Sequence, residues 1–266
     1  MSDKKIQFFF DSGFHLPKEH GFSVIFLCSV LIGIILSFQY PLDILGLILS
    51  LLFAFTIFSS NTSISLMVKT KFMKIHVIPV LLIGSISLAL LLYKLIDHNI
   101  LIFFVTGVFF IVWMILNFMN RGHTTEELVT GSMTLTLFVP LIFINSIDFH
   151  YMTDFLFIQM MFIFWLVAGF TTQLILYVQY QRRMLSLEDF AFIWVCFLVS
   201  LLPFYFYSLL ALKTIIVLIE PSVFVTWLYL KKPELSDKPV FKKIGKLLTV
   251  RLLLYIFLLS FVTYFL

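Results

Sequence analysis

Long runs of hydrophobic residues, separated by short polar segments, follow one another along almost the whole chain. A helix that crosses a membrane needs about 20 mostly apolar residues. Nine runs come close to that length, and they leave no room for a separate soluble domain. The predicted spans are Gly21–Phe38, Leu42–Ser59, His76–Leu95, Ile100–Met119, Leu128–Ile147, Phe155–Tyr177, Phe190–Tyr207, Ala211–Leu230 and Leu247–Leu266. The pattern therefore predicts an all-α fold, a polytopic membrane helix bundle that forms a single transmembrane domain over residues 1–266.

The Lys and Arg residues between these runs fall in alternate loops. Fifteen of the 18 basic residues lie in the N-terminal segment 1–20 or in the loops after the second, fourth, sixth and eighth runs; the last of these is the basic loop 231–246. The other loops and the adjoining run ends carry Asp and His instead, at Asp43, Asp97, His98, Asp148, His150 and Asp154. Because loops rich in Lys and Arg stay on the cytoplasmic side, we expect the N-terminus in the cytoplasm and Leu266 outside.

Three basic residues lie inside predicted spans. Lys94 and Lys213 are near outer ends, and we expect their long side chains to extend to the lipid headgroups. Arg251 lies about one turn inside the last span, counted from its cytoplasmic end.

The composition agrees with a membrane environment. Hydrophobic residues make up 61% of the chain and charged residues 12%, whereas a soluble domain carries roughly a quarter charged residues. This excludes a soluble enzyme, a disordered chain and a nucleic-acid-binding module. The net charge of +4 does not indicate a nucleic-acid partner, because the basic residues serve orientation. We expect membrane lipids as the surroundings and the plasma membrane of a bacterium as the location.

Glu220 is the one acidic residue in the middle of a predicted span, and Pro221 follows it. A charge at that depth costs at least about 2.5–3.5 kcal/mol unless it faces protein or water. The proline weakens the helix at this point and favours a kink. Two interpretations stay open: a proton-carrying group in a polar cavity, or a protonated acid bonded to a neighbouring helix. Arg251 in the next span is a candidate partner.

The cytoplasmic ends of the predicted spans carry a mixture of His, Arg and acidic residues that orientation does not require. The candidates are Lys18, Glu19, His20, Arg121, His123, Glu126, Arg182 and Arg183. Taken singly, they are typical of helix starts and topology determinants; Thr124 and Glu127, for example, have capping-box spacing. Taken together in a compact bundle, they predict a polar cavity for an anionic headgroup or a diphosphate, with Arg as the bidentate partner.

Other polar residues in the predicted spans indicate helix packing more than a binding or catalytic site. Thr130, Ser132, Thr134 and Thr136 lie in the fifth predicted span, where hydroxylated side chains usually hold helices together. The chain has no Walker motif, no Gly-rich nucleotide loop, no H-E-x-x-H and no Asp-rich run, so we expect no metal and no cofactor.

Three segments resemble the YwiC-like family of bacterial integral membrane proteins. They are Leu16–Gly21 (LPKEHG), the pair Glu126-Glu127 with Pro140 later in the same span, and Tyr177–Arg183 (YVQYQRR). The resemblance covers most of the chain. It implies an integral membrane protein and carries over no biochemical activity.

The predicted architecture also resembles that of the UbiA-type prenyltransferases, which have nine helices and functional loops at the cytoplasmic ends of spans 2 and 6. That family places Asp-rich motifs there to hold magnesium and a prenyl diphosphate. The matching places here read Ser59–Ser63 (SSNTS) and Tyr180–Arg183 (YQRR). Because the aspartates are missing, either the activity is lost or anion binding has passed from metal to Arg and Lys.

Three functions agree with these patterns. The leading hypothesis is a multi-pass membrane protein that binds a lipid or isoprenoid-like amphiphile in a cytoplasmic-side cavity near His20, Arg121, Glu126 and Arg182. The second is a proton-coupled transporter that uses Glu220, and the third is a non-catalytic subunit of a membrane complex. Enzymatic activity, the identity of the ligand and the oligomeric state stay open at this point.

Overall fold

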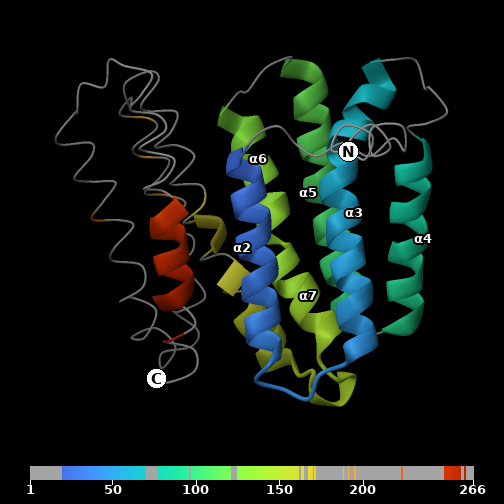
Figure 1. Cartoon of the computed structure of the whole chain (residues 1–266), viewed down its shortest axis with the longest axis vertical. Coiled ribbons are helices and arrows are strands. Elements are labelled where there is room, and N and C mark those ends of the chain that lie inside the picture. Colours follow the sequence, from blue (N-terminus) through green and yellow to red (C-terminus); the bar gives the residue numbers. More distant parts are fainter. Residues whose placement is uncertain are drawn as a thin grey trace, which may run out of the picture.

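The computed structural model describes residues 20–69, 77–95, 97–120, 125–161, 163–164, 167–169, 171, 188, 191, 195, 223, 249–258 and 261. Its named elements are all helical and follow one another as α2 (His20–Ser37), α3 (Ile44–Lys69), α4 (Val77–Tyr93), α5 (Asp97–Asn120), α6 (Thr125–Thr136), α7 (Phe138–Ser146) and the 3-10 helix η2 (Phe149–Tyr151) (Figure 1). Within this part of the chain, extended residues pair at a single antiparallel bridge between Leu42 and Ile147. The all-α class is therefore confirmed.

The ends of α2, α4 and α5 lie within three residues of the predicted spans. Helix α3 differs, because it continues to Lys69, ten residues beyond the predicted end at Ser59. The added residues include a polar run of Ser, Asn and Thr, which lowers the hydropathy of the segment. Each of these residues costs a helix less than about 0.7 kcal/mol relative to alanine, so the helix continues where the apolar pattern stops.

The predicted fifth span is two helices, α6 and α7, with a turn at Leu137 between them. Pro140 explains the break. Proline has no backbone N–H to donate to the carbonyl of Thr136, and its ring crowds that carbonyl. The helix is therefore interrupted one turn before Pro140, although the backbone still continues through the bonds from Leu137 N to Met133 O (3.1 Å) and from Leu141 N to Leu137 O (3.2 Å).

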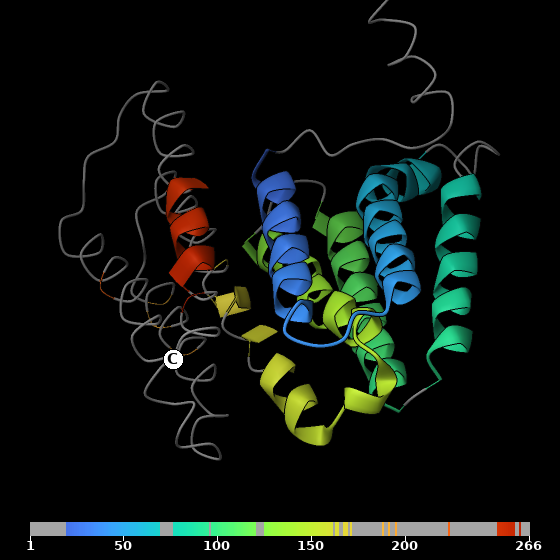
Figure 2. The same ribbon diagram turned by 60° about the horizontal axis from the view of Figure 1, so that its bottom comes forward.

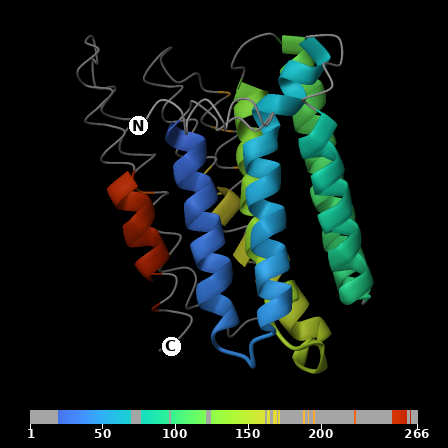
Figure 3. The same cartoon turned by 45° about the vertical axis from the view of Figure 1, so that its right-hand side comes forward.

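Helix α7 lies at the centre of the bundle, and all nine of its residues are buried. Helices α2, α3 and α5 pack against it, whereas α4 packs against α3 at the edge of the bundle (Figure 3). Helix α2 approaches α7 closely at Gly33, where a Cβ atom would lie 3.0 Å from Cβ of Ile142. A side chain at this position would push the two helices apart.

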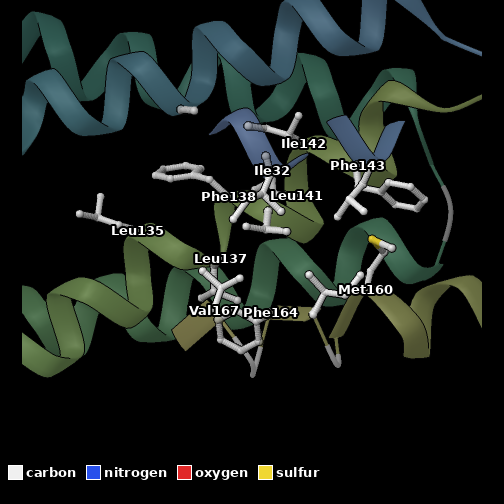
Figure 4. Packing of buried hydrophobic residues seen from close by; sticks show 14 of the residues in the cluster. Ile32, Leu135, Leu137, Phe138, Leu141, Ile142, Phe143, Met160, Phe164 and Val167 are labelled. Atoms are coloured by element: carbon white, nitrogen blue, oxygen red, sulfur yellow. The ribbon is translucent and has the colours of Figure 1, made fainter. Parts of the chain in front are cut away.

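The core around α7 is formed by side chains from helices far apart in the sequence. Figure 4 shows Ile32 of α2, Leu135 of α6 and Ile142 of α7 in one cluster with Met160 and Phe164 from the segment after η2. Leu252, Tyr255 and Ile256, from residues 249–258, belong to the same cluster. The N-terminal helices and the C-terminal region therefore share one core.

Aromatic rings fill part of this core. Phe26 of α2 stacks on Phe58 of α3, with ring centroids 4.2 Å apart, and it meets Phe138 of α7 edge to face at 5.7 Å. Such contacts add about 0.5–1.5 kcal/mol to the area that each pair buries. They tie α2, α3 and α7 together near mid-bundle.

Two helical stretches among the described residues are long and apolar enough to cross a membrane. They are Asp97–Leu116 in α5 and Val129–Ser146 across α6 and α7. The first is only 28% buried and the second 89% buried, so one lies at the surface and the other in the centre. Shorter apolar helical stretches are Ser23–Ser37, Ile44–Ser59, Leu81–Tyr93 and Thr249–Leu258. Nine spans and the orientation of the termini stay predictions.

Candidate functional site

The helices run alternately in opposite directions, so their polar termini gather at two ends of the bundle (Figure 1). We call one the His20 end; there α2, α4 and α6 begin and α3 and α5 end. We call the other the Lys94 end; there α3 and α5 begin and α2, α4 and α7 end. Of the predicted cavity residues, His20 and Glu126 lie at the first. The second carries most of the polar contacts between described segments.

At the His20 end, the structure describes only part of the predicted cavity. His20 is the first residue of α2, and Glu126 lies in the first turn of α6. Arg251 lies in the helical residues 249–258 with a partly buried side chain. The other candidates, Lys18, Glu19, Arg121, His123, Arg182, Arg183 and Glu220, lie outside the described residues.

Two adjacent carboxylates, Glu126 and Glu127, stand in the first turn of α6, and the second is the buried one. Glu126 is exposed, whereas Glu127 is 8% exposed. The reason is helical periodicity: Glu127 shares a face with Gly131 and Thr134, four and seven residues further on, and both are buried. Helix α6 begins at Thr125, directly after Thr124, as the capping-box spacing predicts.

The hydroxylated residues of α6 serve packing. Thr130, Ser132, Thr134 and Thr136 each donate to a backbone carbonyl three or four residues earlier in their own helix, at 2.7–2.9 Å. Among these described hydrogen bonds, none crosses to a neighbouring helix. The last three side chains are fully buried, so they stabilise the bundle by allowing close packing and not by bonds between helices.

At the Lys94 end, a buried ion pair joins two helices. Nζ of Lys94, at the end of α4, lies 2.9 Å from Oδ2 of Asp43, directly before α3. The two side chains are 3% and 15% exposed. The Tyr93 hydroxyl donates to Oδ1 of the same carboxylate at 3.0 Å. Two neighbouring residues of α4 therefore contact one acid.

Asp43 also caps α3. Its Oδ1 accepts the backbone N–H of Gly46 at 3.0 Å, the bond that an N-cap residue makes to the third residue of a helix. The Gly46 N–H and the Lys94 ammonium both stabilise the ionised form of the Asp43 carboxyl. The carboxylate is thus held ionised between a helix N-terminus and a cation.

Lys94 neutralises a helix end of the opposite sign. Its ammonium donates a second hydrogen bond, to the carbonyl of Ile147, which directly follows the last residue of α7. The C-terminus of a helix is electronegative, so a cation is stabilised there. The expectation that Lys94 extends to the lipid headgroups is therefore wrong. A carboxylate and a helix terminus inside the bundle provide partners that the headgroups would otherwise supply.

The segments beside this ion pair are joined by backbone contacts. Asp43 N donates to Ser146 O at 2.8 Å, and Asp148 N donates to Pro41 O at 3.0 Å. These bonds flank the bridge between Leu42 and Ile147, so the loop after α2 pairs with the end of α7. Figure 2 shows this loop beside the end of α7.

Helices α3 and α7 come into backbone contact at Gly46. An added Cβ atom would overlap the carbonyl oxygen of Asn145 and would lie 3.1 Å from Oδ2 of Asp43. Only glycine fits this crossing, because the obstacle is main chain that has no rotamer to change. The close approach places the cap of α3 directly beside the end of α7.

Helix α5 joins the same network at its first turn. The Asn99 side-chain amide donates to the carbonyl of Lys94 at 2.8 Å, and Asn99 is fully buried. Nε2 of its neighbour His98 lies 2.9 Å from Oδ1 of Asp154, the first residue of the helical segment 154–161 that follows η2. This second pair is more exposed, with side-chain exposures of 26% and 90%. It contributes at most about 1 kcal/mol.

The charged groups at the Lys94 end hold helices together. Asp43 and Lys94 neutralise each other, the start of α3 and the end of α7 each face a charge of the opposite sign, and no group of three potential metal ligands occurs among the described residues. This arrangement favours closure of the bundle over binding of an ion.

Sequence reasoning recognised both charges at the Lys94 end but did not pair them. Asp43 was assigned to an acidic outer loop and Lys94 to a lipid-facing span end, 51 positions apart. One local signal was present: Asp43 stands directly before an apolar run, which is the position of an N-cap. The contact between α3 and α4 needed to connect it with Lys94 has no signature in the sequence.

Comparison with known proteins gives one match. Residues 16–145 match the model of the family described as YwiC-like protein, and this confirms the predicted resemblance over that stretch. The matched range contains the segments at Leu16–Gly21 and Glu126–Pro140, whereas Tyr177–Arg183 lies beyond it. No curated protein matches the chain, and no solved structure matches it.

Proposed function

We propose, starting from the match to the YwiC-like family, that the chain is a multi-pass protein of the bacterial plasma membrane that binds an anionic, lipid-like amphiphile at the His20 end. In this proposal residues 1–266 form a single transmembrane domain of nine spans with a cytoplasmic N-terminus. The observation that carries the membrane part is the apolar surface of α4 and α5.

The outward face of α5 is apolar from turn to turn. Phe104 is 69% exposed, Ile111 58% and Ile115 49%. The outward face of α4 is apolar too, with Leu88 at 57% and Leu92 at 70%. Exposed apolar helix faces of this extent are costly in water, but they are the normal surface of a helix in lipid.

The interior of the bundle has the complementary character. Ser132, Thr134 and Asn145 are fully buried, and Lys94 is 5% exposed. A protein in water usually places such groups outward. Polar groups that face the bundle interior and apolar groups that face outward are the distribution that a bilayer selects.

The proposed orientation is supported by the directions of the helices. Three basic segments of the sequence, 1–19, 70–76 and 121–124, adjoin described helix termini that lie at the His20 end. Asp43, Asp97, Asp148 and Asp154 lie at the Lys94 end. By the positive-inside rule, the His20 end is cytoplasmic.

The proposed ligand site lies where α2 and α6 begin and α5 ends. Glu127, in the first turn of α6, is a buried polar residue at this place, and the attraction for an anionic headgroup would come from the neighbouring cationic residues. Arg121 stands in the short connection between α5 and α6, and His20 begins α2. An amphiphile fits this position because its headgroup would meet Arg and His while its apolar part extends along the helices.

Topology is tested with reporter fusions. We expect alkaline phosphatase, which is active outside the cytoplasm, to be active when fused after Leu266 and inactive when fused within 232–246. A fusion within 70–76 is the control for a second cytoplasmic loop. Activity in either internal loop, or inactivity after Leu266 with intact expression, would contradict the nine-span arrangement.

Ligand binding is tested with the purified full-length protein in detergent. We expect phosphatidylglycerol or undecaprenyl phosphate to raise the unfolding temperature, and phosphatidylcholine to leave it unchanged. Arg121→Gln should weaken binding of the anionic lipids by about tenfold or more, because it removes a charge-assisted hydrogen bond. Lys231→Gln, in the basic loop 231–246, is the matched control. Equal losses in the two variants would contradict a specific site at Arg121.

A further inference from the structure

We propose that the contacts at the Lys94 end form a latch that closes this end between the described helices α3, α4, α5 and α7, so that ligands enter between these helices from the His20 end or sideways from the lipid. We define the latch as Asp43, Tyr93, Lys94, Asn99 and Ile147. The proposal rests on the proposed membrane orientation, and it adds a direction of access that the proposed function leaves open.

The latch connects segments that are distant in the sequence through one chain of contacts. Asp43 holds the start of α3, Lys94 holds the end of α4, and Ile147 follows the end of α7. Asn99 adds the start of α5 through its bond to the Lys94 carbonyl. Separating any two of these segments would break an ion pair or a hydrogen bond to buried Lys94.

Complementary charges stabilise the closed arrangement of the helices. The carboxylate of Asp43 faces the electropositive start of α3, and the ammonium of Lys94 faces the electronegative region after α7. Opening would separate Asp43 from Lys94, and Lys94 from the Ile147 carbonyl, in a poorly solvated place. The ion pair therefore favours the closed state over any state in which α3, α4 and α7 separate.

The backbone contacts close the space next to the ion pair. The loop after α2 is bonded to the residues after α7, and Gly46 brings α3 against the carbonyl of Asn145. Ser50, one turn further along α3, is fully buried. Its side chain is a suitable reporter of access from this end.

The test uses Ser50→Cys in the full chain with Cys28→Ala and Cys196→Ala, reconstituted in membranes. A charged, membrane-impermeant methanethiosulfonate reagent is applied to the side that faces the Lys94 end. We expect no reaction in this parent protein. Adding Asp43→Asn should make labelling at least about tenfold faster, the change expected when the closed state loses about 1.4 kcal/mol relative to the open state. Asparagine retains the helix cap while it removes the charge.

Phe149→Cys in the same background identifies the side, because Phe149 in η2 is 53% exposed at this end. If it reacts only from the cytoplasmic side, the proposed orientation fails, and the latch is tested by applying the reagent there. Labelling of Ser50→Cys in the parent would overturn the latch. Equal protection with Asp43→Asn would also overturn it, since closure would not depend on the ion pair. Lys94→Gln provides a second variant if Asp43→Asn does not yield folded protein.

Discussion

Replacement of Lys94 by methionine should lower the free energy of unfolding by about 3 kcal/mol. The Asp43 carboxylate would keep its place near the interior but lose its cation, and the Ile147 carbonyl would lose a charged donor. Thermal unfolding in detergent or lipid nanodiscs measures the change. A lysine that merely extended to the headgroups would give a loss within about 0.5 kcal/mol, as for other surface substitutions.

A double-mutant cycle separates the ion pair from the packing of the lysine stem. Asp43→Asn removes the charge but keeps a residue suited to capping α3. If the pair is coupled, the loss in Asp43→Asn with Lys94→Met should be smaller than the sum of the single losses. His98→Ala, which removes the more exposed pair with Asp154, is the control and should cost less than about 1 kcal/mol. Additive losses for Asp43 and Lys94 would show that the two charges act independently.

Replacement of Gly46 by alanine should be at least as damaging, with a loss of about 3 kcal/mol or more and a reduced yield of folded protein. The new methyl group would overlap the Asn145 carbonyl oxygen, so α3 and α7 would have to separate at their closest point. The same displacement would pull Asp43 away from Lys94. Thermal unfolding and the yield of monodisperse protein measure the effect.

Gly84→Ala is the matched control for this substitution. Gly84 lies in α4 and is exposed, and a Cβ atom there would meet nothing within 4 Å. The change should be neutral or stabilise the protein by up to about 1 kcal/mol, because alanine favours helix over glycine. If both glycine variants behaved alike, helix propensity alone would explain them, and the close contact at Asn145 would have no energetic weight.

The apolar pattern predicted the helices better than their interruptions. It located α2, α4 and α5 within three residues, because a membrane-length apolar run has few other solutions. It ended α3 at Ser59, since hydropathy falls in a polar run even where the helix continues to Lys69. It also joined α6 and α7, because a single proline, Pro140, lowers the mean hydropathy of a long apolar run only slightly.

For the candidate site residues, the sequence likewise predicts position along the chain but not the direction of the side chain. Charge partition assigns Asp43 and Lys94 to one end of the bundle, but it does not give the direction of either side chain. Lys94 turns inward because Asp43 and the Ile147 carbonyl lie within reach, and both belong to other segments of the chain. Likewise, two adjacent glutamates at the start of α6 could not be distinguished until the buried face of that helix was known.

The interruption at Leu137 gives the central helix pair a mechanical property. Helix α7 is anchored at the Lys94 end, whereas α6 carries Glu127 at the other. Because Pro140 cannot donate to the Thr136 carbonyl, one helical hydrogen bond fewer opposes bending between α6 and α7 at this joint. The 12 residues of α6 form a lever arm of about 18 Å, so a tilt of about 10° would move its tip by about 3 Å. Such a tilt would move Glu127 toward or away from α2 and α5, while α7 would keep its position.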